Sequence, residues 1–229
     1  MITLTKESHK KPETAEAVRF IKRLAAKYKI IYGFGNHESR YRDYYPEDYQ
    51  AMMDELEACG VTILRDESAV IGMSNSSGEE TKEYDSSRNE SGKNSVVIYS
   101  AELDSVFYKK LVPLIGKVRE MPEKHLIGKL GIPAPEAVTV LMMHSPLYLK
   151  EAAAWGADLV LSGHFHGGTI RLPDGRGLMT PQYQFFRKEC SGLHFCGKTA
   201  MIVNRGLGTH TFHIRWNDIP EISVIDIEL

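Results

Sequence analysis

The sequence predicts one α/β domain that spans residues 1–229. Three observations predict this class: helix-like and strand-like patterns alternate along most of the chain, strand-like patterns dominate its end, and the composition is that of an ordinary globular protein, with 42% hydrophobic and 25% charged residues. A chain of 229 residues is long enough to bury one sizeable core. The strand-rich end indicates an antiparallel or mixed sheet there.

The first part of the chain alternates between helical periodicity and short apolar runs. A helix is expected over residues 12–28, because Pro12 suits a first turn and apolar residues recur at helical spacing. A second helix is expected from Pro46 to Gly60, since acidic residues occupy its first turn and a glycine ends it. Short apolar runs predict three strands, at residues 29–35, 61–64 and 69–73.

Residues 74–94 interrupt this pattern with a polar, serine-rich stretch. We expect a flexible surface insertion here, because the stretch has too few apolar residues to pack against a core. Strand patterns resume on both sides of it, so it is not expected to separate two domains.

The second part of the chain continues the alternation and then becomes rich in strands. Helices are expected at residues 102–120, broken near Pro113, and at 145–156, ended by Gly156. The expected strands lie at residues 95–100, 136–144, 158–164, 199–208, 210–216 and 221–229.

Composition excludes several classes of protein. The formal net charge is −2 and no block of lysine and arginine stands out, so no nucleic-acid-binding patch is evident. The three cysteines are an odd number without regular spacing, which favours free thiols over a disulfide framework, although Cys190 and Cys196 could pair or bind metal. The apolar run at residues 138–143 is far shorter than the roughly 20 residues of a membrane span, and the polar N-terminus has no signal-peptide pattern. We therefore expect this chain to be cytoplasmic.

Polar clusters follow three of the expected strands, at the point where each strand ends. They are GNHE at residues 35–38, MHSP at 143–146 and GHFHGG at 163–168. Because ligands of open α/β sheets bind at the carboxyl ends of the strands, the clusters are expected to share one pocket. Imidazole nitrogens and an amide oxygen form a donor set for a divalent metal ion. The side chains concerned are Asn36, His37, His144, His164 and His166.

An alternative hypothesis assigns these side chains no ligand. A single histidine at a strand end is usually hydrogen-bonded within the protein, and Asn-His in a glycine-rich stretch can simply form a turn. The chain contains nine histidines, so one His-x-His pattern can arise by chance. The occurrence of three such clusters at three strand ends favours a common site.

The three motifs, taken in order, resemble those of the calcineurin-like metallophosphoesterases, which carry G-N-H-[DE], a histidine and G-H-x-H. The continuations GHFHGGTIRLP, VNRGLG and IRWNDIPEISVIDIEL resemble a bacterial branch of predicted phosphohydrolases of the YkuE/YaeI type, which often begins with a membrane anchor. The resemblance runs from about residue 14 to the C-terminus and is weakest over residues 74–135. It implies a metallophosphoesterase-type β-sandwich flanked by helices (αββα), with two metal ions that are often manganese, iron or zinc.

The resemblance also implies a role for each motif residue. Ligands of the second metal would be Asn36, His144 and His164, whereas His166 would bind the first metal. His37 would contact the phosphate and protonate the leaving group, with Glu38 orienting it. The implied chemistry is phosphoester hydrolysis assisted by two metal ions. Apart from the resemblance, Arg205 and Arg215, together with Arg171, are candidate phosphate contacts, although a surface or structural role is favoured for each.

Two motifs of the family have no counterpart in this sequence. The family has D-x-H and G-D-x-x-D before G-N-H-[DE], and they supply the remaining ligands of the first metal and the aspartate that bridges both metals. Residues 1–28 contain neither motif. We therefore expect one bound metal ion or none, and a domain that is N-terminally truncated relative to the family.

Three explanations of this difference stay open. The chain could be a fragment whose complete form carries the first βα units, a shortened paralogue with weak activity, or a protein whose substitute ligands come from elsewhere. Loss of central strands would expose sheet edges and apolar faces, so the chain is expected to aggregate, to form a homo-oligomer that covers the truncated sheet, or to need the missing segment in trans.

The leading functional hypothesis is a metal-dependent phosphoesterase that acts on a phosphomonoester or phosphodiester, with part of the metal site on this chain. The alternative is a catalytically weak or inactive paralogue that binds metal or phosphate, or that serves as an assembly partner. The sequence does not select a substrate, since one fold hosts many substrates.

Overall fold

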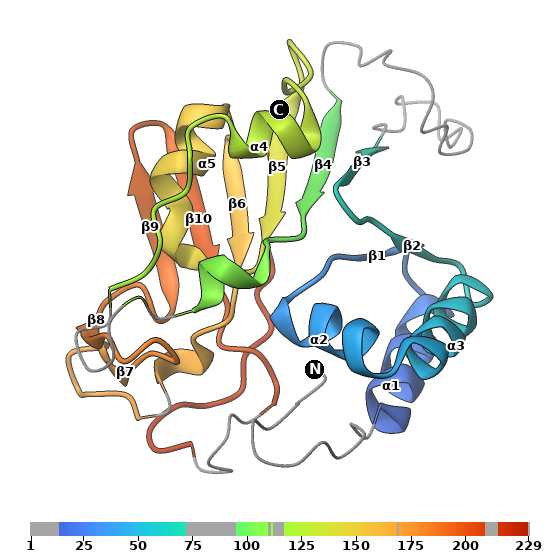
Figure 1. The fold of residues 1–229 in the computed structure, drawn as a ribbon, viewed down its shortest axis with the longest axis horizontal. Coiled ribbons are helices and arrows are strands. Elements are labelled where there is room, and N and C mark those ends of the chain that lie inside the picture. The colour runs from blue at the N-terminus through green and yellow to red at the C-terminus, as the bar shows by residue number, and fades with distance from the viewer. Residues whose placement is uncertain are drawn as a thin grey trace.

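A computed structural model describes residues 14–71, 95–109, 111, 117–168, 170–208 and 215–228. It confirms the α/β class, with a six-stranded mixed sheet as its largest element (Figure 1). The insertion expected at residues 74–94 lies outside the described residues, as does most of the strand expected at 210–216.

The six-stranded sheet has the order β3-β4-β5-β6-β10-β9. Its four central strands are parallel, whereas β3 and β9 join the two edges in antiparallel fashion. The parallel strands therefore end at one common edge, where the MHSP and GHFHGG clusters lie. The strands are β3 (Glu67–Ile71), β4 (Val96–Ala101), β5 (Val138–Met143), β6 (Leu159–Ser162), β9 (Gly192–Cys196) and β10 (Thr199–Val203).

Helices α4 (His125–Leu130) and α5 (Leu149–Trp155) cover one face of this sheet (Figure 1). The ring of Trp155 packs edge-on against Tyr99 of β4 at 5.0 Å, and its indole N–H donates to the carbonyl of Gly131. Gly156 has φ +114°, a left-handed conformation that glycine adopts readily, so it ends α5 as the sequence predicts.

A smaller unit with its own core precedes the sheet. It comprises α1 (Ala15–Ala25), β1 (Ile30–Tyr32), α2 (Asn36–Tyr44), α3 (Pro46–Glu57) and β2 (Val61–Ile63), with β1 and β2 paired in parallel. Its buried core residues are Val18, Phe34, Tyr41, Tyr49, Met52, Met53, Leu56 and Val61. α1 and α3 confirm the two predicted helices within the described residues, whereas α2 was not predicted.

A buried carboxylate joins the two parts of the molecule. Glu102, directly after β4, accepts hydrogen bonds from Ser39 Oγ at 2.6 Å and from Arg42 Nη1 at 2.9 and 3.0 Å, both on α2. Arg65 Nε also donates to it. This network fixes α2 against the carboxyl end of β4, and α2 begins with the residues of the GNHE motif.

Two predicted elements are corrected by the structure. The helix predicted over residues 102–120 is wrong: the described part contains only a short 3₁₀ turn, η1 (Ser105–Tyr108), because Glu102 is held by the arginines and the backbone is extended again at Lys109. The strand predicted at 221–229 pairs with no other strand among the described residues.

The structure also contains elements that the sequence did not reveal. Besides α2 and α4, these are the hairpin of β7 (Gly177–Met179) with β8 (Phe185–Arg187), and β9. All three strands fall in the segment 176–198, for which no element was predicted.

Apolar side chains are exposed along the C-terminal segment 219–227. The exposed fraction reaches 70% for Ile222 and 88% for Val224. Exposed apolar side chains that gather on one segment form a surface that favours association. None of the helices in the described part of the chain is long and apolar enough to span a bilayer.

Candidate functional site

A cavity of about 600 Å³ lies between the smaller unit, the C-terminal segment and the sheet face opposite α4 and α5. One part of its wall is apolar, with Ile21 of α1, Ile202 of β10 and Ile225 of the C-terminal segment. The other part is polar and gathers candidates from all three motifs. These polar residues are His37, Glu38, His144, His164, His166 and Arg205.

The GNHE motif forms the first turn of α2. The carboxylate of Glu38 accepts hydrogen bonds from the backbone N–H of Gly35 at 3.0 Å and from the hydroxyl of Tyr32 at 3.1 Å. This contact of the third helical residue with the N-cap backbone stabilises the start of the helix. Asn36 Oδ1 is buried and has no hydrogen-bond partner among the described residues, so it is available to a ligand.

His144 follows β5 and stands against the start of α2. A Cβ atom at Gly35 would lie 3.0 Å from the His144 ring, so a larger residue there would push the ring away from its present position. Burial lowers the pKa of His144, while the charge of Glu38 opposes that shift. The imidazole is therefore neutral at pH 7, which is the form that binds metal ions.

The GHFHGG motif forms a turn in which left-handed backbone predominates. His164 has φ +66° and His166 has φ +48°, conformations that are uncommon for residues with a side chain. Phe165 between them is buried, and both histidines are more than nine-tenths buried. Such backbone strain often accompanies functional sites, because the surrounding structure must hold it in place.

The rings of His144 and His164 are neighbours, with centroids 5.2 Å apart. Backbone contacts hold them there: Gly163 N–H donates to the carbonyl of His144 at 3.1 Å, and Ser162 Oγ donates to that of Met143 at 2.6 Å. The ring of Tyr108, at the end of η1, packs edge-on against His164 at 5.0 Å. The convergence expected from strand ends is thus seen for the β5 and β6 clusters.

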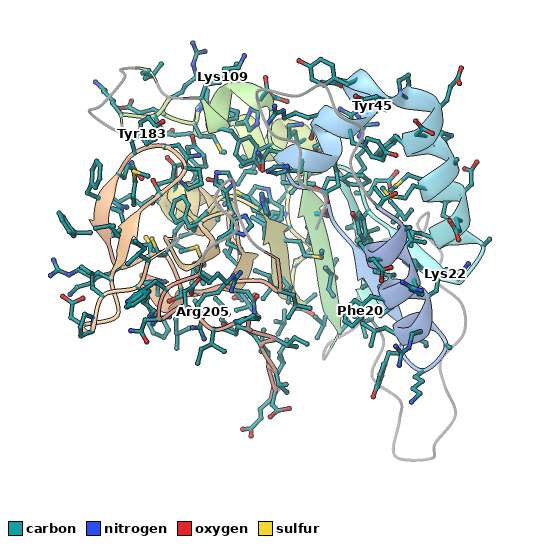
Figure 2. The ribbon with its side chains drawn as sticks, turned by 90° about the horizontal axis from the view of Figure 1, so that it is seen from below. Phe20, Lys22, Tyr45, Lys109, Tyr183 and Arg205 are labelled. Atoms are coloured by element: carbon teal, nitrogen blue, oxygen red, sulfur yellow. The ribbon has the colours of Figure 1, made fainter. Side chains whose placement is uncertain are left out.

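Gln182 reaches the same place from the loop between β7 and β8. Its Nε2 lies 2.7 Å from His164 Nε2 and 3.5 Å from the carbonyl of Tyr108. Figure 2 labels Lys109 and Tyr183, which follow Tyr108 and Gln182 in the chain, both in the upper left part of the view. Neither Gln182 nor Tyr108 belongs to a motif, so no sequence signal identified them.

The two candidate arginines are engaged within the protein. Arg205 Nε pairs with Glu221, and Arg205 also lines the cavity. Arg215 is not among the cavity-lining residues; it donates to the carbonyls of Gly208 and Arg205, the latter at 2.7 Å. Between both arginines lies Asp218, a third residue that the sequence did not identify.

The donor set fits a divalent ion only in part. Two imidazoles, those of His144 and His164, lie close together, and Asn36 Oδ1 is a buried oxygen donor next to Gly35. Within the described residues, however, no group of three or more His, Cys, Asp or Glu side chains is arranged to hold a metal ion. The arrangement therefore offers nitrogen and amide oxygen ligands without the carboxylates that usually balance the charge of the ion.

Comparison with known proteins confirms the resemblance to metallophosphoesterases. The chain is 34% identical over 101 residues to the uncharacterized metallophosphoesterase YkuE of Bacillus subtilis (strain 168), a match that covers 44% of this chain and 35% of YkuE. It is 29% identical over 84 residues to the uncharacterized metallophosphoesterase YkoQ of the same organism, covering 37% of this chain and 31% of YkoQ.

The chain thus spans about a third of the length of these two relatives. No family model matches it, and no solved structure matches it.

Proposed function

Because the chain is similar to two proteins named metallophosphoesterases, we propose that it hydrolyses phosphoesters with the help of a divalent metal ion. The observation that carries the proposal is the convergence of the three histidine-bearing motifs on one cavity. The two-sheet sandwich implied by the family stays a prediction.

The metal would be held at the carboxyl ends of β5 and β6. The proposed ligands are Asn36, His144 and His164 for one ion, and His166 for a second ion if two are bound. Manganese, iron and zinc all accept nitrogen and oxygen ligands. When bound, such an ion supplies Lewis-acid polarisation of the phosphoryl group.

The remaining roles fall to side chains of this chain. We assign His37, which lines the cavity, the binding of the phosphoryl group and the donation of a proton to the leaving oxygen. Glu38 keeps the first turn of α2, and thereby His37, at the cavity wall. Arg205 stays a candidate phosphate contact on the cavity wall, where a phosphate would replace its partner Glu221, whereas Arg215 acts through the backbone that it braces.

A metal-binding or phosphate-binding protein without turnover is the second candidate. It is favoured by the lack, among the described residues, of a group of three metal-binding acids, histidines or cysteines. Elemental analysis of the purified protein, combined with a turnover assay, separates the candidates, because robust turnover with two ions per chain excludes a merely binding function.

The direct test is hydrolysis of an aryl phosphoester with added Mn²⁺ or Zn²⁺. We expect His164→Ala and His37→Ala to lower the rate by about 10²-fold or more. His194→Ala is the matched control, because this histidine of β9 bonds the carbonyl of Ser191 and does not line the cavity. Equal rates in the wild type and both cavity variants would refute the proposal.

We further propose that the exposed C-terminal segment pairs with the same segment of a second copy. Identical apolar patches are self-complementary when they meet about a two-fold axis. Light scattering should give a dimer for the wild type and a monomer for Val224→Lys, which places a charge on the most exposed apolar residue of the segment. A monomeric wild type would refute the pairing.

A further inference from the structure

Gln182 makes a contact that bears on which nitrogen of His164 can bind a metal ion. The side chain is 1% exposed, and its amide nitrogen lies 2.7 Å from His164 Nε2. Its other polar atom, Oε1, is buried and has no hydrogen-bond partner among the described residues. The amide nitrogen also lies 3.5 Å from the carbonyl oxygen of Tyr108, so the contact with His164 is the closest polar contact of this amide.

A hydrogen bond between an amide and an imidazole fixes the position of the ring proton. An amide offers a donor and an acceptor of similar shape, and a rotation of 180° about the last side-chain bond exchanges them. When the amide nitrogen donates, His164 Nε2 is the acceptor and the ring proton is on Nδ1. When the amide oxygen accepts, Nε2 carries the proton and Nδ1 carries the lone pair.

Only the second arrangement permits His164 to bind metal while Gln182 keeps its place. The amide covers the Nε2 side of the ring in both arrangements, so an ion must approach from the Nδ1 side. Nδ1 binds an ion only when it carries no proton. Histidine ligands commonly donate their other ring N–H to an oxygen acceptor, which orients the ring and raises the basicity of the ligand.

We propose that Gln182 is a positioning residue of the metal site, whose carbonyl oxygen accepts a hydrogen bond from Nε2–H of His164 and so makes Nδ1 the metal-binding nitrogen. The inference rests on the proposed function, because it takes His164 as a ligand. The edge-on ring of Tyr108 at 5.0 Å holds the imidazole on a second side. Together the two contacts would fix the plane of the ring before an ion arrives.

The test compares the affinity for Mn²⁺ and Zn²⁺ of the wild type, Gln182→Met, Gln182→Glu and Gln184→Met, measured by competition with a chromophoric chelator. We expect Gln182→Met, of similar shape but without an acceptor, to bind about 10- to 100-fold more weakly. Gln182→Glu keeps an acceptor oxygen and should bind within about threefold of the wild type or more tightly. Gln184→Met is the control from the same hairpin and should leave the affinity unchanged.

Two outcomes would overturn the inference: an unchanged affinity in Gln182→Met, or an equal loss in Gln182→Met and Gln182→Glu. A second measurement needs neither a variant nor a metal. Nitrogen-15 NMR of the histidine rings in the metal-free wild type should show the Nε2-protonated tautomer of His164, whereas the Nδ1-protonated tautomer would overturn the inference. Failure of the wild type to bind metal or hydrolyse phosphoester would instead refute the proposed function.

Discussion

Two carboxylates in this molecule stand between pairs of arginines, and their surroundings differ in one respect. Glu102 receives direct hydrogen bonds from Ser39, Arg42 and Arg65. Asp218 is fully buried, yet its oxygens are 3.8 and 3.6 Å from the guanidinium nitrogens of its two arginines and have no hydrogen-bond partner among the described residues. The same charges thus make a bonded network in one place and an unbonded ion pair in the other.

The pKa values of the two acids move in opposite directions. Burial would raise the pKa of Glu102, but the hydrogen bonds from the serine and the arginines outweigh it and lower the pKa. Burial raises the pKa of Asp218, and the attraction of Arg215 and Arg205 does not cancel this shift. A buried ion pair therefore stabilises a fold only where hydrogen bonds replace the lost hydration.

Glu102 and Asp218 each lie next to a motif of the candidate site. Glu102 holds α2, whose first turn carries the GNHE motif. Asp218 packs against Gly167, directly after His166. Glu102 thus holds α2 against the sheet. Asp218 packs against the strained turn of the GHFHGG motif.

The largest expected effect is that of Gly167→Ala, which tests how rigidly Asp218 is held. Gly167 has φ +67°, and a Cβ atom there would lie 2.0 Å from Asp218 Oδ1. We expect a loss of about 4 kcal/mol in the free energy of unfolding, from overlap and backbone strain together. Gly197→Ala is the matched control, because its φ is +60° and nothing lies within 4 Å, so backbone strain alone should cost about 1 kcal/mol.

Urea unfolding of both variants measures the difference. Equal losses of unfolding free energy in the two variants would contradict the close packing of Asp218 against Gly167.

The second expected effect is that of Glu102→Ala, which removes the bonded network. We expect a loss of about 3 kcal/mol in the free energy of unfolding, because the carboxylate is 9% exposed and its partners lose charged hydrogen bonds. Glu55→Ala removes an exposed ion pair with Lys22 and should leave the stability nearly unchanged. If the two variants unfold at the same urea concentration, the network adds no stability.

These contacts also show what the sequence could and could not predict. The short apolar runs predicted β1, β5 and β6, because each strand is bounded by polar or glycine-rich residues. The helix α2 was missed, since its first residues resemble a turn and its stability comes from contacts such as Arg42 with Glu102. The helix expected at 102–120 failed for the same reason, because tertiary contacts of Glu102 outweigh local helical periodicity.

The residues of the candidate site also fall into those that the sequence predicted and those that it did not. The motif residues could be predicted because each motif is contiguous and follows a strand. Tyr108, Gln182 and Asp218 lie outside the motifs in sequence, and only folding brings the first two against His164 and the third against Gly167. No local pattern marks a residue whose role depends on a distant partner.

A third prediction uses the opposite pKa shifts. Because the folded pKa of Glu102 is lowered, its stabilising contribution is present above the ordinary value of 4.5 and is lost as the pH falls through the folded pKa. Because that of Asp218 is raised, its contribution is present below the ordinary value of 3.8 and is lost as the pH rises through the folded pKa.

Unfolding curves measured from about pH 3 to pH 7 should therefore show opposite slopes, since this range covers the ordinary titration of both acids. The stability of the wild type relative to Glu102→Gln should rise with pH, and that relative to Asp218→Asn should fall. If both stability differences change with pH in the same direction, the two carboxylates do not differ in their hydrogen bonding as described.

The smallest expected effect is that of Asp218→Asn at neutral pH. The substitution keeps the shape of the side chain and removes a buried charge whose oxygens make no hydrogen bond among the described residues. It also removes the attraction of Arg205 and Arg215, so the gain and the loss nearly cancel, and the free energy of unfolding should change by less than about 1 kcal/mol. Glu102→Gln, the equivalent change in the bonded network, should cost more, because two arginines lose a charged acceptor. If Asp218→Asn is the more damaging of the two, the long ion pairs of Asp218 stabilise the fold more than direct hydrogen bonds do, and geometry is not what separates these two carboxylates.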